Sequence, residues 1–351
     1  MKLISFLLAG LLAAFLTAFA ASAQAQSYQA AMSVLEIADP DPDPEGGRDL
    51  DGFLWYPTNT VEPLTYDFDS KVWTGTQVVK DAVPAKGPFP LVVLSHGMFG
   101  NAYNQAWLAG ALARRGYVVA AISHPGTSTW SRDPDLTRQL WERPKDISRV
   151  IDHMFTSPDL ARLVDPDRIF MAGHSLGGFT AVALAGGLYD TARLERFCST
   201  MPDELACGIL RGWKIAQTDE DRAQIEADLS DPRIRAFAVF DLGGTQSFSD
   251  ASLARIERPM LIFGAPIMNS GLTLDIESRS LVASLPSGKT RYIEPETLSH
   301  FDFLGVCKPG GFELLAEEEP GDEMICENGG APRAAKHEMI IDAVTGFFSK
   351  S

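Results

Sequence analysis

Short apolar runs alternate with stretches of helical period through most of the chain. The apolar runs contain few polar residues, which is typical of strands buried on both faces of a parallel sheet. They lie at 90–95, 117–122, 169–172, 234–240, 260–263 and 291–293. The helical stretches lie at 106–115, 146–155, 179–187 and 335–348. Strands that alternate with helices form βαβ units, so we predict an α/β fold with a mostly parallel central sheet and helices on both faces.

Two segments depart from this alternation. Residues 24–50 are polar and rich in turn formers, and their alternating prolines exclude a helix, so we expect a solvated loop rather than a calcium site. The first strands follow at 53–57 and 77–80. Residues 188–233 separate a predicted helix from the next strand by much more than an ordinary connection. We predict a helical, lid-like insertion there, with a subdomain that lacks this role as the alternative.

The first 23 residues have the pattern of a secretory signal peptide. Lys2 precedes an apolar run at 3–20, and small residues at 21–23 form a cleavage site, with an alternative site at 23–25. A cleavage site directly after the run disfavours a membrane anchor, and no cysteine stands there to carry a lipid. We therefore expect an exported protein, periplasmic or secreted, without a stable membrane anchor. Residues 24–351 are expected to form a single α/β domain.

The charge of the chain bears on its partners. The formal net charge is −16. A surface this acidic repels nucleic acid and anionic membranes, and we expect neither as a partner. Its general effect is to keep an exported protein soluble. The composition predicts no particular oligomeric state.

The four cysteines fit an oxidising compartment. They fall into two local couples, Cys198 with Cys207 and Cys307 with Cys326, which is one of three connectivities. We favour these pairs because each closes a loop rich in polar residues and turn formers, with a stabilisation of ~2–4 kcal/mol. No histidine lies at ligand spacing from a cysteine, so we expect disulfides and no metal site.

A turn at 173–177 carries the strongest chemical signal. It reads Gly-His-Ser-Leu-Gly and stands between a predicted strand and a run of small, helix-compatible residues. A serine on a sharp strand-to-helix turn, with glycines that let neighbouring backbone pass closely, is typical of the nucleophile of a hydrolase. A purely structural turn is the alternative reading of the motif. The context favours Ser175 as a nucleophile.

A serine hydroxyl needs a base, and two histidines follow Ser175 in the chain order serine, acid, histidine that this kind of site uses. His300 comes just after the last apolar strand, at the edge of the sheet where ligands of open α/β folds bind. His337 lies in the C-terminal helical stretch, where we expect it to face solvent. We therefore predict His300 as the base.

Two carboxylates compete for the role of the acid. Asp241 directly follows the run at 234–240, so it is expected on the same rim of the sheet as Ser175 and His300. Asp275 lies in the loop after the next strand, which supplies the acid in many hydrolases of this fold. The beginning of that loop, at 265–270, holds no carboxylate. We prefer Asp241 and keep Asp275 as the alternative.

Acyl transfer also needs hydrogen-bond donors for an oxyanion. The backbone N–H of Leu176 stands at the start of a helix, and the loop at 96–100 follows an earlier strand in the place of the second donor, which we assign to the N–H of Met98. We expect His96 to hold this loop by hydrogen bonding and His174 to be packed rather than to carry protons. No metal-binding, phosphate-binding or dinucleotide motif is present, so no cofactor is expected.

The chain resembles the predicted dienelactone hydrolase family of α/β hydrolases and is similar to the platelet-activating-factor acetylhydrolases. The resemblance covers most of the chain after the signal and rests on Ser-His-Gly-Met (95–98), Gly-His-Ser-Leu-Gly-Gly (173–178), Asp241, Ser-His-Phe-Asp-Phe-Leu (299–304), Leu-Trp-Tyr-Pro (54–57), Arg-Pro-Lys-Asp (143–146), Cys307 and Cys326. It implies Ser175 as nucleophile, His300 as base, and Met98 and Leu176 as oxyanion donors. In the acetylhydrolases the acid stands at the position that matches Asp241.

The resemblance also bears on the substrate. True dienelactone hydrolases use a cysteine nucleophile, so a serine at 175 disfavours lactone opening and favours simple carboxylic esters. The two glycine-containing motifs are similar to those of bacterial polyester hydrolases, which adds polymeric esters to small-molecule ones. We therefore predict an exported serine esterase with a Ser175-His300-Asp241 triad. A peptidase or amidase on the same triad, and a non-catalytic binding module on the same scaffold, are the alternatives.

Overall fold

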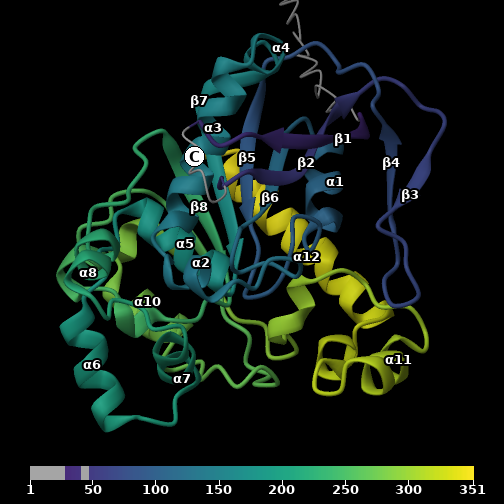
Figure 1. Ribbon diagram of the computed structural model, residues 1–351. Coiled ribbons are helices and arrows are strands. Elements are labelled where there is room, and N and C mark those ends of the chain that lie inside the picture. The colour runs from purple at the N-terminus through teal and green to yellow at the C-terminus, as the bar shows by residue number, and fades with distance from the viewer. Residues whose placement is uncertain (1–27, 41–46) are drawn as a thin grey trace, which may run out of the picture.

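The computed structural model describes residues 28–40 and 47–351. The predicted signal peptide and most of the proline-rich acidic loop lie outside these residues. The described strands form one ten-stranded sheet in the order β10-β9-β8-β7-β5-β6-β2-β1-β4-β3 (Figure 1). They are β1 (Gln29–Ile37), β2 (Leu50–Thr58), β3 (Thr65–Asp67), β4 (Thr76–Lys80), β5 (Phe89–Ser95), β6 (Val118–Ser123), β7 (Val164–His174), β8 (Ile234–Phe240), β9 (Met260–Phe263) and β10 (Thr290–Ile293).

The half of the sheet that contains the six apolar runs from residue 90 onward is parallel. β5 to β10 pair in parallel with one another, whereas β2 runs antiparallel to β6, and β1 runs antiparallel to β2. β4 pairs in parallel with β1 at the far edge, where β3 completes the sheet. The predicted α/β fold with a mostly parallel central sheet is confirmed.

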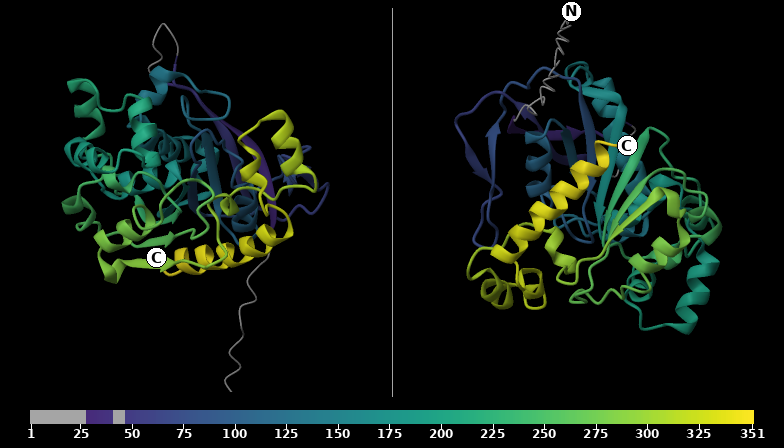
Figure 2. Two further views of the ribbon diagram at one scale, coloured as in Figure 1. Left: turned by 90° about the horizontal axis from the view of Figure 1, so that it is seen from below. Right: turned by 180° about the vertical axis from the view of Figure 1, so that it is seen from behind.

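Helices cover both faces of this sheet. Side chains alternate along a strand, so Val92 and Leu94 pack against α1 and α12, whereas Leu91 and Val93 pack against α3 and α5. α12 crosses one face of the sheet in the view from behind (Figure 2). The helices are α1 (Ala106–Arg114), α2 (Pro134–Arg138), α3 (Glu142–Thr156), α4 (Pro158–Ala161), α5 (Leu176–Ala185), α6 (Thr191–Thr200), α7 (Leu205–Gly212), α8 (Asp219–Ile225), α9 (Asp250–Leu253), α10 (Ser278–Ser284), α11 (Gly311–Glu318) and α12 (Ala331–Phe348).

Two elements differ from the sequence prediction. Residues 24–50 were expected to be a loop, but Gln29–Ile37 form β1, which pairs with β2 along its whole length. Its first half shows no alternation, because Ala30, Ala31 and Met32 are all buried, so the strand leaves little period-2 signal. β7 also begins earlier than the apolar run at 169–172, since residues 165–167 already belong to it, in a mostly exposed stretch where the pairing with β5 shifts register.

Two segments extend beyond the sheet. Residues 188–233 fold into α6, α7 and α8 between α5 and β8. After β10, a short 3-10 helix η3 (His300–Phe303) precedes α11 and a second one, η4 (Glu323–Cys326). In Figure 1, α7 and α11 both lie at the lower side of the molecule. These two segments form walls of the cavity described below.

Candidate active site

Ser175 alone makes the turn between β7 and α5. Its backbone is in a strained region, with φ 54° and ψ −116°, and its N–H donates to the carbonyl of Phe240 at 2.9 Å. The flanking glycines are required by space, because a Cβ on Gly177 would lie 1.9 Å from the carbonyl oxygen of Ser95, and one on Gly173 would lie 2.0 Å from that of Gly177. The turn therefore holds the Ser175 side chain where α5 begins.

His300 and Asp241 are in direct contact. His300 Nδ1 lies 2.7 Å from Asp241 Oδ2, and both side chains are buried. The second carboxylate oxygen of Asp241 accepts a hydrogen bond from the N–H of Ala265 at 3.0 Å and lies 3.4 Å from the hydroxyl of Ser278. With Nδ1–H donated to Asp241, the lone pair of the imidazole is on Nε2, the tautomer that a general base needs.

Asp275, the alternative acid, lies elsewhere. Its carboxylate is exposed and forms an ion pair with Arg279 at 2.8 Å. A different carboxylate stands behind Asp241: Glu277 is buried, accepts the N–H of Thr245 at 2.8 Å, and has its pKa raised to about 7, mainly by burial. Sequence reasoning missed Glu277, because its partner is 32 residues away and no local pattern marks it.

The loop after β5 carries Met98, which lines the same cavity as Ser175. In the described part of the chain, neither the N–H of Met98 nor that of Leu176 donates to a protein acceptor, whereas the next amide, of Phe99, donates to the carbonyl of Thr127 at 2.8 Å. His96 holds this loop, since its Nδ1 lies 2.7 Å from the carbonyl of Gly97 and its Nε2 accepts the N–H of His124. Burial lowers the pKa of His96 well below its usual range.

Two further histidines, His174 and His337, hold backbone carbonyls. His174 is buried beside Ser175, and its Nε2 lies 2.9 Å from the carbonyl oxygen of His300. The expectation that His337 faces solvent is wrong. It is buried, stacks on Trp107 with ring centroids 3.6 Å apart, and lies 2.9 Å from the carbonyl oxygen of Asp302 through Nε2. α12 packs the face that carries His337 against α1. The charged neighbours of His337 in the sequence give no sign of this burial.

A cavity of about 480 Å³ contains Ser175 and His300 in its lining. The wall from the insertion is apolar and comes mainly from α7, with Leu205, Ile209, Leu210 and Trp213. The opposite wall comes from the segment after η3, with Leu304, Leu315 and Ile325, and from Trp73. Such apolar walls suit a bulky apolar group, although the lining also includes the polar side chains of Asn104, Arg132, Glu319 and Asp322.

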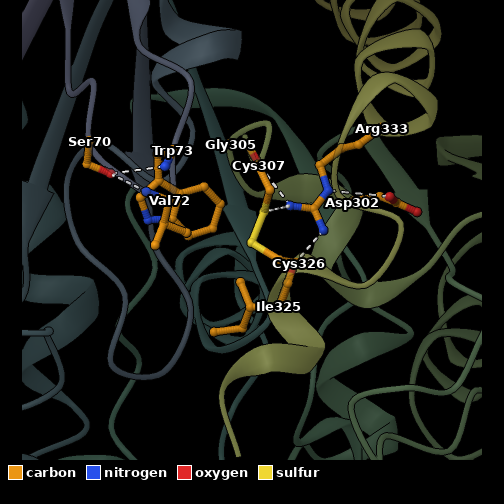
Figure 3. The surroundings of a disulfide bond; sticks show 9 residues. All are labelled: Ser70, Val72, Trp73, Asp302, Gly305, Cys307, Ile325, Cys326 and Arg333. Atoms are coloured by element: carbon orange, nitrogen blue, oxygen red, sulfur yellow. Dashed lines mark hydrogen bonds and ion pairs between the residues drawn. A yellow bond between two sulfur atoms is a disulfide. The ribbon is translucent and has the colours of Figure 1, made fainter. Parts of the chain in front are cut away.

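Each of the two segments that supply these walls contains a disulfide. Cys198 is linked to Cys207 between α6 and α7, and Cys307 to Cys326 around α11. Figure 3 shows Arg333 beside the second bond, where it donates to the carbonyl oxygens of Gly305 and Ile325 at 2.8 and 2.6 Å and faces Asp302. Arg333 thereby ties this wall to η3, the segment that carries His300.

Neither metal ligands nor membrane spans are evident within 28–40 and 47–351. No group of three or more histidine, cysteine, aspartate or glutamate side chains is arranged to hold a metal ion there. Within the same residues, no helix is both long enough and apolar enough to cross a membrane.

Comparison with known proteins places the chain in a family. Residues 92–300 match the model of the alpha/beta hydrolase family, and the chain belongs to that family. Two cutinases of Thermobifida alba, est1 and est2, are each 31% identical to it over 96 residues, which is 27% of this chain and 29% of each cutinase. The match thus spans less than a third of these relatives. A ferulic acid esterase from Streptomyces cinnamoneus shares the fold, with a TM-score of 0.61, 23% identity, and coverage of 94% of this chain and 92% of that one.

Proposed function

We propose that this protein is an exported serine hydrolase that cleaves carboxylic esters through an acyl-enzyme intermediate. The observation that carries the proposal is the 2.7 Å contact between His300 and Asp241, in a cavity lined by both His300 and the strained Ser175. Membership of the alpha/beta hydrolase family and the partial similarity to cutinases support ester hydrolysis. The two disulfides support export to an oxidising compartment.

The proposed reaction has two stages. Ser175 Oγ attacks the ester carbonyl carbon while His300 Nε2 takes the hydroxyl proton, and Asp241 orients and stabilises the imidazolium. The N–H groups of Met98 and Leu176 donate to the oxyanion. The carbon–oxygen bond to the alcohol then breaks, and His300 returns its proton to the leaving oxygen. Water, deprotonated by His300, attacks the acyl-serine; the bond to Ser175 Oγ breaks, His300 gives its proton to that oxygen, and the carboxylic acid is released.

The substrate class follows from the nucleophile and the walls of the cavity. A serine at 175, where dienelactone hydrolases have a cysteine, favours esters over dienelactones within the family that the sequence resembles. α7 supplies an apolar wall, which supports a lid-like role for residues 188–233 and a bulky apolar group in the substrate. Polymeric esters remain within this class, since the partial relatives are cutinases.

The test compares esters with amides of the same acyl group. Purified protein should hydrolyse 4-nitrophenyl butyrate, and Ser175→Ala should reduce turnover to background. Hydrolysis of the matched 4-nitroanilide at an equal rate would instead identify an amidase. If no activated ester is turned over faster by the wild type than by Ser175→Ala, the protein is a binding module and the proposal fails.

A further inference from the structure

A buried arginine lies beneath the candidate active site. Arg143, in the first turn of α3, is 1% exposed. Its Nη2 donates to the carbonyl oxygen of His96 and to the hydroxyl of Ser95, and its Nη1 donates to the hydroxyl of Thr127 at 2.6 Å. Its Nε donates to the hydroxyl of Thr180 at 3.1 Å. This one planar group thus contacts three segments: the end of β5, the loop after β6, and α5.

These contacts lead to both candidate oxyanion donors. The hydroxyl of Thr180 donates onward to the carbonyl oxygen of Leu176 at 3.1 Å. On the other side, His96 and Gly97 immediately precede Met98, and the backbone carbonyl of Thr127 accepts the N–H of Phe99 at 2.8 Å. The two amides belong to different segments of the chain, so their relative position depends on the groups that join these segments.

Arg143 is linked to a buried carboxylate only through two intervening side chains. Ser95 Oγ lies 2.9 Å from His124 Nε2, and His124 Nδ1 lies 2.9 Å from Asp146, which also accepts two hydrogen bonds from Arg48. This is a second serine-histidine-aspartate array, but all three members are at most 1% exposed, so no substrate reaches it. Burial lowers the pKa of His124 well below its usual range, which keeps its Nε2 an acceptor for the Ser95 hydroxyl.

We propose that Arg143 is a positioning residue that sets the spacing of the oxyanion hole by joining the Met98 loop to the N-terminus of α5. The inference rests on the proposed function of Ser175, Met98 and Leu176. Lysine keeps the charge but presents one point of donation rather than a planar fork, so it cannot hold four oxygens on three segments at once. The spacing therefore depends on the shape of the guanidinium and not only on its charge.

The test uses Arg143→Lys with active sites counted by a fluorophosphonate titrant. For 4-nitrophenyl butyrate we expect kcat per titrated site to fall about 10²-fold, while KM changes by less than about threefold. Phenylboronic acid forms a tetrahedral adduct with a reactive serine, and its affinity should fall in parallel with kcat because the adduct uses the same donors. Thr180→Val is a milder variant that removes the hydroxyl between Arg143 and the carbonyl of Leu176. We expect it to lower kcat per titrated site about tenfold.

The control is Phe348→Ala, a core truncation at the far end of α12, where Phe348 stacks on Phe170. It should lower the melting temperature without changing kcat per titrated site. If Arg143→Lys loses only titratable sites, or keeps the wild-type kcat and boronate affinity, the positioning role is overturned while the proposed function stands. A wild-type protein that the phosphonate does not titrate would overturn the proposed function, and this inference with it.

Discussion

His174 donates a hydrogen bond from Nε2 to the backbone carbonyl of His300 at 2.9 Å. The residue that precedes the candidate nucleophile thus holds the segment that carries the candidate base, and the two rings lie with centroids 4.5 Å apart. Burial lowers the pKa of His174 well below its usual range, so the ring stays neutral and keeps Nε2–H as the donor. This hydrogen bond therefore couples the segment of the candidate nucleophile directly to that of the candidate base.

This contact predicts a graded effect at position 174. His174→Phe fills the space but leaves the His300 carbonyl without its donor, which should lower kcat about fivefold to tenfold. His174→Gln can place an amide N–H near the position of Nε2 and should recover most of the rate. Steady-state kinetics per titrated active site measures both. Equal losses in the two variants would show that the hydrogen bond is not the cause.

The acid is tested by a pair of matched substitutions. Asp241→Asn removes the carboxylate that orients His300 and should lower kcat by about 10³- to 10⁴-fold, because the imidazole is then held in the wrong tautomer. Asp275→Asn removes an exposed carboxylate that contacts Arg279 and should leave kcat within about twofold. The reverse pattern would transfer the role of the acid to Asp275.

The α7 wall predicts a change in substrate preference. Trp213 lines the cavity beside Phe99, with ring centroids 5.9 Å apart. Trp213→Ala should raise KM for esters with bulky acyl groups while 4-nitrophenyl acetate is turned over as before, because a small acyl group does not reach the wall. Trp130→Ala is the control, since Trp130 is exposed and does not line the cavity. A uniform loss on all esters would argue against a substrate-binding wall.

The buried His337 predicts loss of stability in acid. Burial lowers its pKa to about 4, whereas the unfolded chain takes up the proton near pH 6.5. Its contribution to stability is therefore complete above about pH 6.5 and is lost as the pH falls toward 4, at about 1.4 kcal/mol per pH unit. His337→Gln keeps a donor for the Asp302 carbonyl but does not titrate. Urea unfolding from pH 7.5 to 4.5 should show a flatter decline for this variant, and parallel declines would contradict the prediction.

Local patterns account for what could be predicted from the sequence. The turn at 173–177 combines a strand, a serine between close-packed glycines and a helix, and all of these features lie within a short stretch. Asp241 and His300 are predicted as site residues in the same way, because each follows an apolar strand at the edge where the parallel strands end. The sheet positions these residues, so the pattern of strands predicts their neighbourhood.

What could not be predicted depends on distant partners. Arg143 contacts Ser95, 48 residues earlier, and Thr180, 37 residues later. No local motif predicts that its guanidinium lies between these two side chains. His337 has the charged neighbours Lys336 and Glu338, which suggest an exposed position, yet its burial is decided by Trp107 on another helix. Such residues become visible only once the packing of the helices on the sheet is known.

The central claim is that Ser175 is the nucleophile, and covalent labelling tests it most directly. A fluorophosphonate should form one adduct per molecule, which peptide mass spectrometry should place on the peptide that contains Ser175. Ser175→Ala should not be labelled, whereas Ser95→Ala should still be labelled at Ser175, because Ser95 is buried. An adduct on another residue, or labelling of Ser175→Ala as strong as that of the wild type, would contradict the account.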